Sequence, residues 1–125
     1  MNDNAGVWID HRRATIVIGS AGSERISTIL SGIESHQARH VAPDDRRQMA
    51  LTGHLDRYYD KVIAALENVG SLLIFGPGEA KGQLATRIRS SPFGGNIVTV
   101  TSADKMTDSQ IVGQVRDHFA NARST

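Results

Sequence analysis

The chain has no cysteine among its 125 residues. That absence excludes disulfide bonds, thiolate metal sites and a cysteine nucleophile, and it is compatible with a reducing cytosol. An excess of charge of one sign is also lacking, since 14 lysines and arginines face 13 aspartates and glutamates, for a net charge of +1. No overall field attracts nucleic acid or an anionic membrane, so any basic surface must be local.

Long apolar runs are missing too. No stretch approaches the roughly 20 apolar residues that a membrane-spanning helix needs. The opening residues MNDNAGVW lack the basic and apolar regions of a signal peptide. We therefore expect a cytoplasmic protein with no membrane partner. The length suits one domain over 1–125 with a single core.

Runs of β-branched and apolar residues predict three strands, over 6–10, 14–20 and 24–30. Tight polar turns separate these runs, which is typical of an antiparallel meander. The next region, 31–48, reads SGIESHQARHVAPDDRRQ and has few large apolar residues. A loop of that length in so small a domain is usually functional or disordered.

From Met49 the apolar residues take helical spacing, and Gly70 is the expected end of that helix. The pattern then predicts a buried strand over 71–75, a short helix over 79–88 and a strand over 96–101.

Thr107 and Gln110 have the spacing of a capping box and predict the start of a final helix. Met106 and Ile111 stand where a hydrophobic staple would lie. The element order is thus three strands, helix, strand, helix, strand, helix. It predicts an α/β fold of the ribonuclease H-like kind, a five-stranded mixed sheet of order 3-2-1-4-5 with helices on its faces.

The stretch LLIFGPGEAKGQL, residues 72–84, ends an apolar strand at Gly76, Pro77 and Gly78. A P-loop would need glycine where Lys81 stands, and the dinucleotide fingerprint would need its third glycine at that same position. We therefore expect no nucleotide cofactor. Two interpretations remain: an anion site made by the helix start with Lys81, or turn chemistry beside a solvated lysine.

Asp10 ends the first predicted strand, where ribonuclease H-like nucleases place a metal ligand. Two-metal chemistry needs several converging carboxylates, and only a few distant aspartates are available. A strand-end turn aspartate is the alternative. The aspartates that the fold would have to bring close to Asp10 for a metal site are Asp56, Asp60 and Asp104.

His36 and His40 have helical spacing, and His54 follows further on. Without acids or cysteines at ligand spacing they do not predict a zinc site, and we expect no metal.

Arginines gather in the region 31–48 and in the first turn. Arg39, Arg46 and Arg47 occupy the former, and Arg12 and Arg13 the latter. The planar guanidinium suits phosphate contact, while a solvated surface partly neutralised by nearby aspartates is the alternative.

The segment VWIDHRRATIVI and the strand that runs into GPGEAKGQL resemble the middle domain of class-I archaeal and eukaryotic release factors and of Pelota-type rescue proteins. The segments DRYYDKVIAAL, LLIFGPGEAKGQL and TSADKMTDSQIVGQVRDHF resemble a family of small bacterial translational machinery proteins related to that domain. The resemblance covers most of the chain. It implies the ribonuclease H-like fold and a role in translation.

In the release factors, the loop that corresponds to 31–48 carries a Gly-Gly-Gln motif, whose glutamine helps water cleave peptidyl-tRNA. Here Gln37 follows Ser35 and His36, so the flexible glycines are absent. The resemblance therefore implies a translation context without carrying over peptidyl-tRNA hydrolysis.

Three hypotheses follow. The first is a non-catalytic module that binds the ribosome or tRNA. A second is an enzyme, either a metal-dependent nuclease centred on Asp10 or a peptidyl-tRNA hydrolase using Gln37. A third is a protein–protein adaptor that forms a homodimer through the sheet edge or through the helix with Tyr58 and Tyr59. The phosphate-binding residues of the first hypothesis are Arg39, His40, Arg46 and Arg47, with Gly76, Gly78 and Lys81 as a second anion site.

Overall fold

The computed structural model describes residues 3–19, 24–32, 44–66, 69–90 and 97–123. Their strands form one five-stranded sheet of order β3-β2-β1-β4-β5. β2 pairs antiparallel with β1 and β3, and β4 pairs parallel with β1 and β5. The predicted mixed α/β sheet and its strand order are thus confirmed. The strands are β1 (Asp3–Ile9), β2 (Arg13–Ile18), β3 (Arg25–Leu30), β4 (Val69–Gly76) and β5 (Ile97–Ser102).

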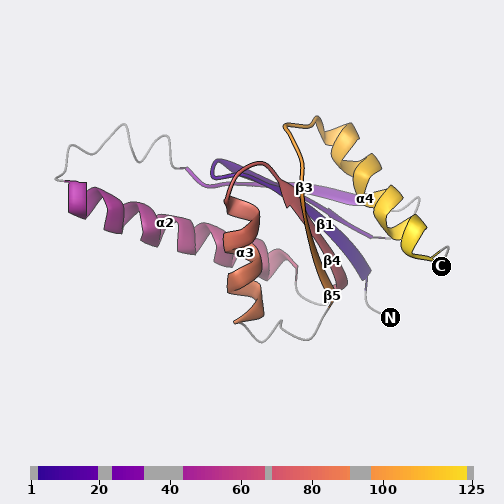
Figure 1. Ribbon diagram of the computed structural model, residues 1–125, viewed down its shortest axis with the longest axis horizontal. Coiled ribbons are helices and arrows are strands. Elements are labelled where there is room, and N and C mark those ends of the chain that lie inside the picture. Colours follow the sequence, from indigo (N-terminus) through magenta and orange to yellow (C-terminus); the bar gives the residue numbers. More distant parts are fainter. Residues whose placement is uncertain (1–2, 20–23, 33–43, 67–68, 91–96, 124–125) are drawn as a thin grey trace.

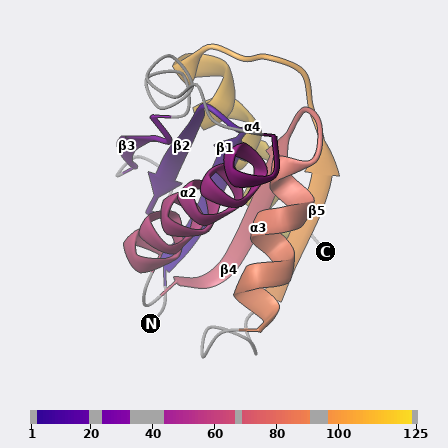
Figure 2. The same ribbon diagram turned by 90° about the vertical axis from the view of Figure 1, so that its left-hand side faces the viewer.

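Helices cover both faces of this sheet (Figures 1 and 2). α2 (Asp44–Ala65) and α3 (Ala80–Arg89) pack on one face, and α4 (Asp108–Arg123) packs on the other. β1, β2 and β4 each contribute to both cores because their side chains alternate between the faces. In β1, for example, Val7 and Ile9 belong to the core under α2 and α3, while Trp8 belongs to the core under α4.

α4 lies very close to the centre of the sheet, and a glycine permits this. A Cβ built on Gly6 of β1 would stand 2.2 Å from the Cγ2 atom of Val115. No side chain fits there while Val115 keeps its place, so Gly6 sets the depth at which α4 packs.

The start of α4 has the predicted capping box. The backbone N–H of Gln110 donates to Oγ1 of Thr107 at 3.2 Å, and the backbone N–H of Thr107 donates to Oε1 of Gln110 at 2.9 Å. Met106 and Ile111 pack in the same core cluster, as the staple requires.

Two predicted boundaries of the long helix are wrong. α2 begins at Asp44 rather than at Met49, so the stretch 31–48 is not all loop. Two aspartates at the start of a helix interact favourably with its dipole, which explains the early start. α2 also ends at Ala65, and Gly70 lies within β4, because pairing with β1 extends that strand back to Val69.

None of the helices in the described ranges is long and apolar enough to cross a membrane.

Candidate nucleic-acid interface

Four strands end at the same edge of the sheet. β1, β3, β4 and β5 run in one direction, since two antiparallel pairings restore the direction of β1 in β3. Open α/β sheets bind ligands outside the carboxyl ends of their strands. We call this region the carboxyl edge and define it as residues 10–13, 31–32, 76–81 and 102–105.

Asp10 occupies the turn between β1 and β2. Its Oδ1 atom accepts hydrogen bonds from the backbone N–H groups of Arg12 and Arg13, both at 2.8 Å. Its carbonyl oxygen accepts from the hydroxyl of Tyr58 on α2 at 2.9 Å. These are the contacts of an aspartate that stabilises a turn. In the part of the chain that the structure describes, no three His, Asp or Glu side chains gather to hold a metal ion.

The Gly-Pro-Gly turn that follows β4 is explained by backbone geometry. Gly76 has φ +147°, and a Cβ there would lie 2.2 Å from the carbonyl oxygen of Ile9 in the neighbouring strand. Gly78 has φ +69°, in the left-handed region that glycine favours. Both glycines are therefore needed by the turn itself.

Lys81, in the first turn of α3, bends back to the Gly-Pro-Gly turn. Its Nζ atom donates to the carbonyl oxygen of Gly78 at 2.5 Å. A hollow of about 400 Å³ lies between this turn and the loop after β5. The hollow is lined by Gly76, Pro77, Gly78, Lys81, Ser102, Ala103 and Asp104.

A glutamine that sequence reasoning did not single out joins three elements at this edge. Oε1 of Gln83 on α3 accepts a hydrogen bond from the hydroxyl of Tyr59 at 2.5 Å and lies 3.1 Å from Nε2 of His11. α3, α2 and the β1–β2 turn therefore meet at one amide oxygen. The adjacent tyrosines on α2 were the available sequence signal, since buried tyrosine hydroxyls need partners.

Burial changes the acidity of these tyrosines. It raises the pKa of Tyr59 to about 12, with the carboxylate of Asp56 adding to the effect. Burial likewise raises the pKa of Tyr58, further than that of its neighbour, and the Asp10 carboxylate adds to this shift. Both hydroxyls thus remain protonated donors at neutral pH.

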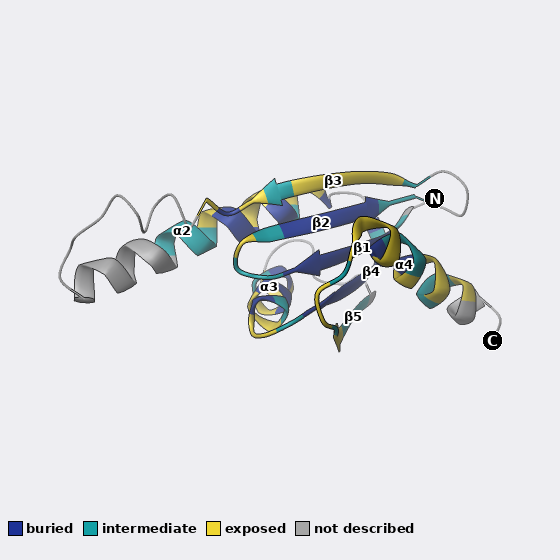
Figure 3. Ribbon diagram, turned by 90° about the horizontal axis from the view of Figure 1, so that it is seen from above, coloured by how far each residue is buried: buried dark blue, intermediate teal, exposed yellow. Residues whose placement is uncertain are grey.

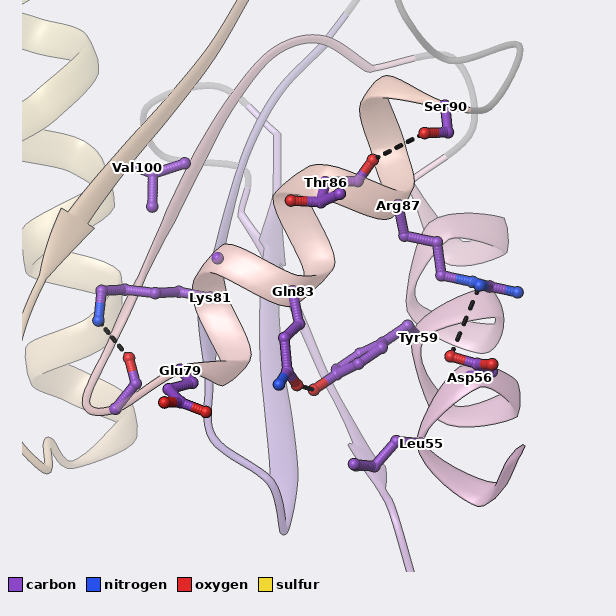
Figure 4. Close-up of a pocket in the computed structure, with 12 residues that line it drawn as sticks. Leu55, Asp56, Tyr59, Glu79, Lys81, Gln83, Thr86, Arg87, Ser90 and Val100 are labelled. Carbon is purple, nitrogen blue, oxygen red and sulfur yellow. Dashed lines mark hydrogen bonds and ion pairs between the residues drawn. The ribbon is translucent and has the colours of Figure 1, made fainter. Parts of the chain in front are cut away.

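A groove of about 870 Å³ borders α3 on the side of α2 (Figure 4). Arg87 reaches across it from α3 to two carboxylates on α2. Its Nε and Nη2 atoms donate to Asp60 at 2.6 and 3.0 Å, and its Nη1 atom lies 3.6 Å from Asp56. The hydrogen bond from Arg87 lowers the pKa of Asp60. These two aspartates serve as ion-pair partners of Arg87.

The candidate site residues predicted in the region 31–48 divide into two groups. Gln37, Arg39 and His40 lie outside the described residues. Arg46 and Arg47 belong to the first turns of α2, whose amino-terminal half extends beyond the sheet (Figure 1).

α2 is attached to the carboxyl edge further along its length. The ring Nε2 of His54 contacts the carbonyl oxygen of Ser31, directly after β3, and Tyr58 bonds to Asp10. The start of α2 therefore projects past this edge. The topology places Arg46 and Arg47 on the same side of the molecule as the Arg12–Arg13 turn.

No family model matches the chain, and no curated protein matches it. Solved structures do. The Pelota protein of Thermoplasma acidophilum aligns with a TM-score of 0.61 and 23% identity over 90% of this chain and 31% of Pelota. Pelota of Archaeoglobus fulgidus aligns with a TM-score of 0.62 and 13% identity, over 94% of this chain and 31% of that protein.

The archaeal translation termination factor aRF1 is a more distant match, with a TM-score of 0.49 and 11% identity over 98% of this chain and 39% of the factor. That likeness is too weak to argue from. The chain thus spans about a third of the length of the Pelota proteins whose fold it shares.

Proposed function

We propose that this chain is a translation-associated module that binds ribosomal RNA or tRNA and has no catalytic activity of its own. The observation that supports this most is the likeness to Pelota, which extends over nine-tenths of the chain or more in two independent structures. A shared fold does not fix a function, so the surface chemistry has to agree with the proposal.

Basic residues lie along the surface where the proposal places an RNA backbone. Arg12 and Lys105 are exposed at the carboxyl edge. Arg13 stacks over the ring of Trp8 at 5.2 Å, which holds its guanidinium at the surface of the turn. Arg46 and Arg47 extend the same side along α2. Such groups bind phosphate oxygens irrespective of base sequence.

The proposed RNA interface includes three further basic residues. Arg39 and His40 belong to it on sequence grounds alone. Lys81 forms its second anion site with Gly76 and Gly78, and an arriving phosphate competes with the Gly78 carbonyl for the lysine ammonium.

The proposal predicts a steep dependence on salt. If about four cations neutralise phosphates, the logarithm of the affinity falls with the logarithm of salt concentration with a slope of roughly −3. Raising salt from about 50 to about 200 mM should then weaken binding by roughly 60-fold. Co-sedimentation with ribosomes at the two salt concentrations measures this. Absence of association at the lower concentration would refute the proposal.

A charge-neutralising variant locates the interface. Arg46→Gln combined with Arg47→Gln should weaken co-sedimentation and reduce the salt slope by about 2. Arg89→Gln is the matched control, because Arg89 is exposed at the far end of α3, on the opposite edge of the sheet. Equal losses in both variants would show that binding does not use the proposed surface.

The non-catalytic part of the proposal has its own test. Without the two glycines before it, Gln37 lacks the backbone freedom that the Gly-Gly-Gln motif supplies in release factors. We expect no release of peptide from ribosome-bound peptidyl-tRNA above the uncatalysed rate. Release that disappears in Gln37→Ala would contradict this expectation.

A further inference from the structure

The outermost strand, β3, exposes two large apolar side chains. Ile26 is 48% exposed and Leu30 is 69% exposed, and among the described residues these are the exposed large hydrophobic side chains. Every residue of the strand except Ile29 is exposed (Figure 3). The strand next to it, β2, is buried at all four of its central residues, so β3 differs sharply from its neighbour.

The two apolar side chains lie on one face of the sheet. Ile26 pairs with Val17 of β2, and Leu30 pairs with Arg13, in a register that places Thr28 between them opposite Thr15. Val17 belongs to the core under α4, so this is the α4 face. In Figure 3, none of the described helices covers β3 along this face.

Natural edge strands usually carry features that prevent pairing with another chain, such as lysine, proline or a β-bulge. The sequence of β3, RISTIL, has neither lysine nor proline, and its only charge is Arg25 at the first position. Its pairing with β2 runs without a register shift from Arg25 to Leu30. β3 thus presents a regular edge over six residues, on which Ile26 and Leu30 are exposed apolar side chains.

We propose that this edge pairs with β3 of a second copy of the chain, antiparallel, about a twofold axis through Thr28. Opposed side chains in an antiparallel pair lie on the same face, so a residue can oppose only residues an even number of positions away. With the axis at Thr28, Ile26 faces Leu30 of the second copy, and Thr28 faces Thr28. Both exposed apolar side chains of each copy then obtain an apolar partner.

Neighbouring registers do not achieve this. An axis one position earlier places Leu30 opposite Glu24, a carboxylate already bound by Arg116 of α4. An axis one position later places Ile26 opposite Gly32, which offers no side chain. The self-complementarity of RISTIL is the reason to prefer a second copy over an unrelated extended peptide.

The resulting interface is small. Each copy contributes a strand of only six residues, whereas specific, stable interfaces use about 20–30 residues on each side. We therefore expect a reversible dimer that forms as the protein concentration rises. Sedimentation velocity from low micromolar to about millimolar protein should show monomer giving way to dimer. A monomer throughout this range would overturn the proposal and would leave β3 to other partners.

Cysteine scanning tests the register, since the chain has no cysteine of its own. Directly opposed residues have Cα atoms about 4.5–5.5 Å apart, within the range of a disulfide. Thr28→Cys should therefore form a disulfide-linked dimer under mild oxidation. Ile26→Cys is the matched control on the same face of the same strand. Its two copies would be separated by about 14 Å, four residues along the strand.

We expect Thr28→Cys to cross-link at least about tenfold faster than Ile26→Cys, because only the former meets its own copy. Thr101→Cys on β5 reports on the opposite edge of the sheet and should also cross-link slowly. Equal rates at all three positions would overturn the register, and a fastest rate at Thr101 would move the interface to β5.

A charge at the apolar pair tests the energetics. Leu30→Glu places a carboxylate opposite Ile26 of the second copy and should raise the dissociation constant at least about tenfold. Because Leu30 is mostly exposed, the fold of the monomer should be retained, as thermal unfolding can verify. Thr101→Glu serves as the control. A dimer that forms equally well with Leu30→Glu would contradict the proposed pairing.

Discussion

Three glycines around the Gly-Pro-Gly turn provide a graded test of the geometry described above. Each is changed to alanine, which adds a single methyl group. Gly76 lies against the backbone of β1, Gly78 faces open space at positive φ, and Gly82 lies in α3 with nothing within 4 Å of an added Cβ. The three substitutions therefore separate a backbone clash, a dihedral cost and a helix-propensity gain.

Gly76→Ala should cost the most. A residue held at an unfavourable φ costs about 1–3 kcal/mol. The Cβ at 2.2 Å from the Ile9 carbonyl oxygen forces strands β1 and β4 apart, for about 1–3 kcal/mol more. The sum, about 2–6 kcal/mol, is a large share of the roughly 5–15 kcal/mol by which a domain is stable.

The other two changes should be mild. Gly78→Ala pays about 1–2 kcal/mol for the left-handed conformation. It regains about 0.4–1 kcal/mol from a less flexible unfolded chain. Gly82→Ala should stabilise the protein by about 0.5–1 kcal/mol, because alanine is the better residue inside a helix.

Urea denaturation followed by tryptophan emission measures all three variants. Trp8 is the single tryptophan of the chain and is fully buried in the core under α4. The expected order of unfolding midpoints is Gly82→Ala above wild type, then Gly78→Ala, then Gly76→Ala. If Gly76→Ala were no less stable than Gly78→Ala, the explanation of Gly76 by its contact with Ile9 would be wrong.

Three further predictions concern the helices. Gly6→Ala should destabilise the protein by about 1–3 kcal/mol. The double variant with Val115→Ala should lose at least about 0.5 kcal/mol less than the sum of the two single variants, because the new Cβ fills the space that the valine vacates. Additive unfolding free energies from urea denaturation would refute the contact. Stability should fall as pH rises from 10 to 12, because the folded state keeps Tyr59 protonated to a pKa of about 12 and Tyr58 higher, while unfolded tyrosines ionise at 10.0. Tyr59→Phe should make that fall shallower in urea midpoints measured across this pH range, and an unchanged slope would contradict the assignment. Thr107→Ala should lower the unfolding free energy by about 1 kcal/mol, and Thr107→Ser should retain most of that stability because serine keeps the capping hydroxyl. Equal urea midpoints for the two variants would argue against the cap.

Local patterns were sufficient to predict the order and type of the elements. The run of β-branched residues in β2 and the capping box at Thr107 depend on residues close together in sequence, and both agree with the structure. The end of α2 did not follow from such patterns. Gly70 has the local properties of a helix stop, but pairing with the distant strand β1 draws it into β4. Helix and strand boundaries that depend on long-range strand pairing cannot be predicted from the local sequence.

The same distinction applies to the candidate site. Asp10 was predicted at the end of β1 and lies there, and its turn contacts could be anticipated because an aspartate often accepts from the next backbone N–H groups. Gln83 could not be anticipated from its own position, because its partners Tyr59 and His11 come from two other elements. The adjacent tyrosines indicated only that their buried hydroxyls need partners. The roles proposed for Lys81 and the basic residues remain predictions.

The central place of β1 in the sheet bears on how the chain folds during synthesis. β1 can form a hairpin with β2 early, because the turn between them is short. Its other neighbour, β4, comes much later in the sequence, since Val7 of β1 pairs with Ile74 of β4. Until the ribosome has passed β4, one edge of β1 stays open, and the face of β1 that α4 covers stays bare as well. Non-local pairing of this kind slows folding and leaves nascent chains prone to aggregation. The period of greatest exposure to misfolding thus falls between the emergence of β3 and that of β4.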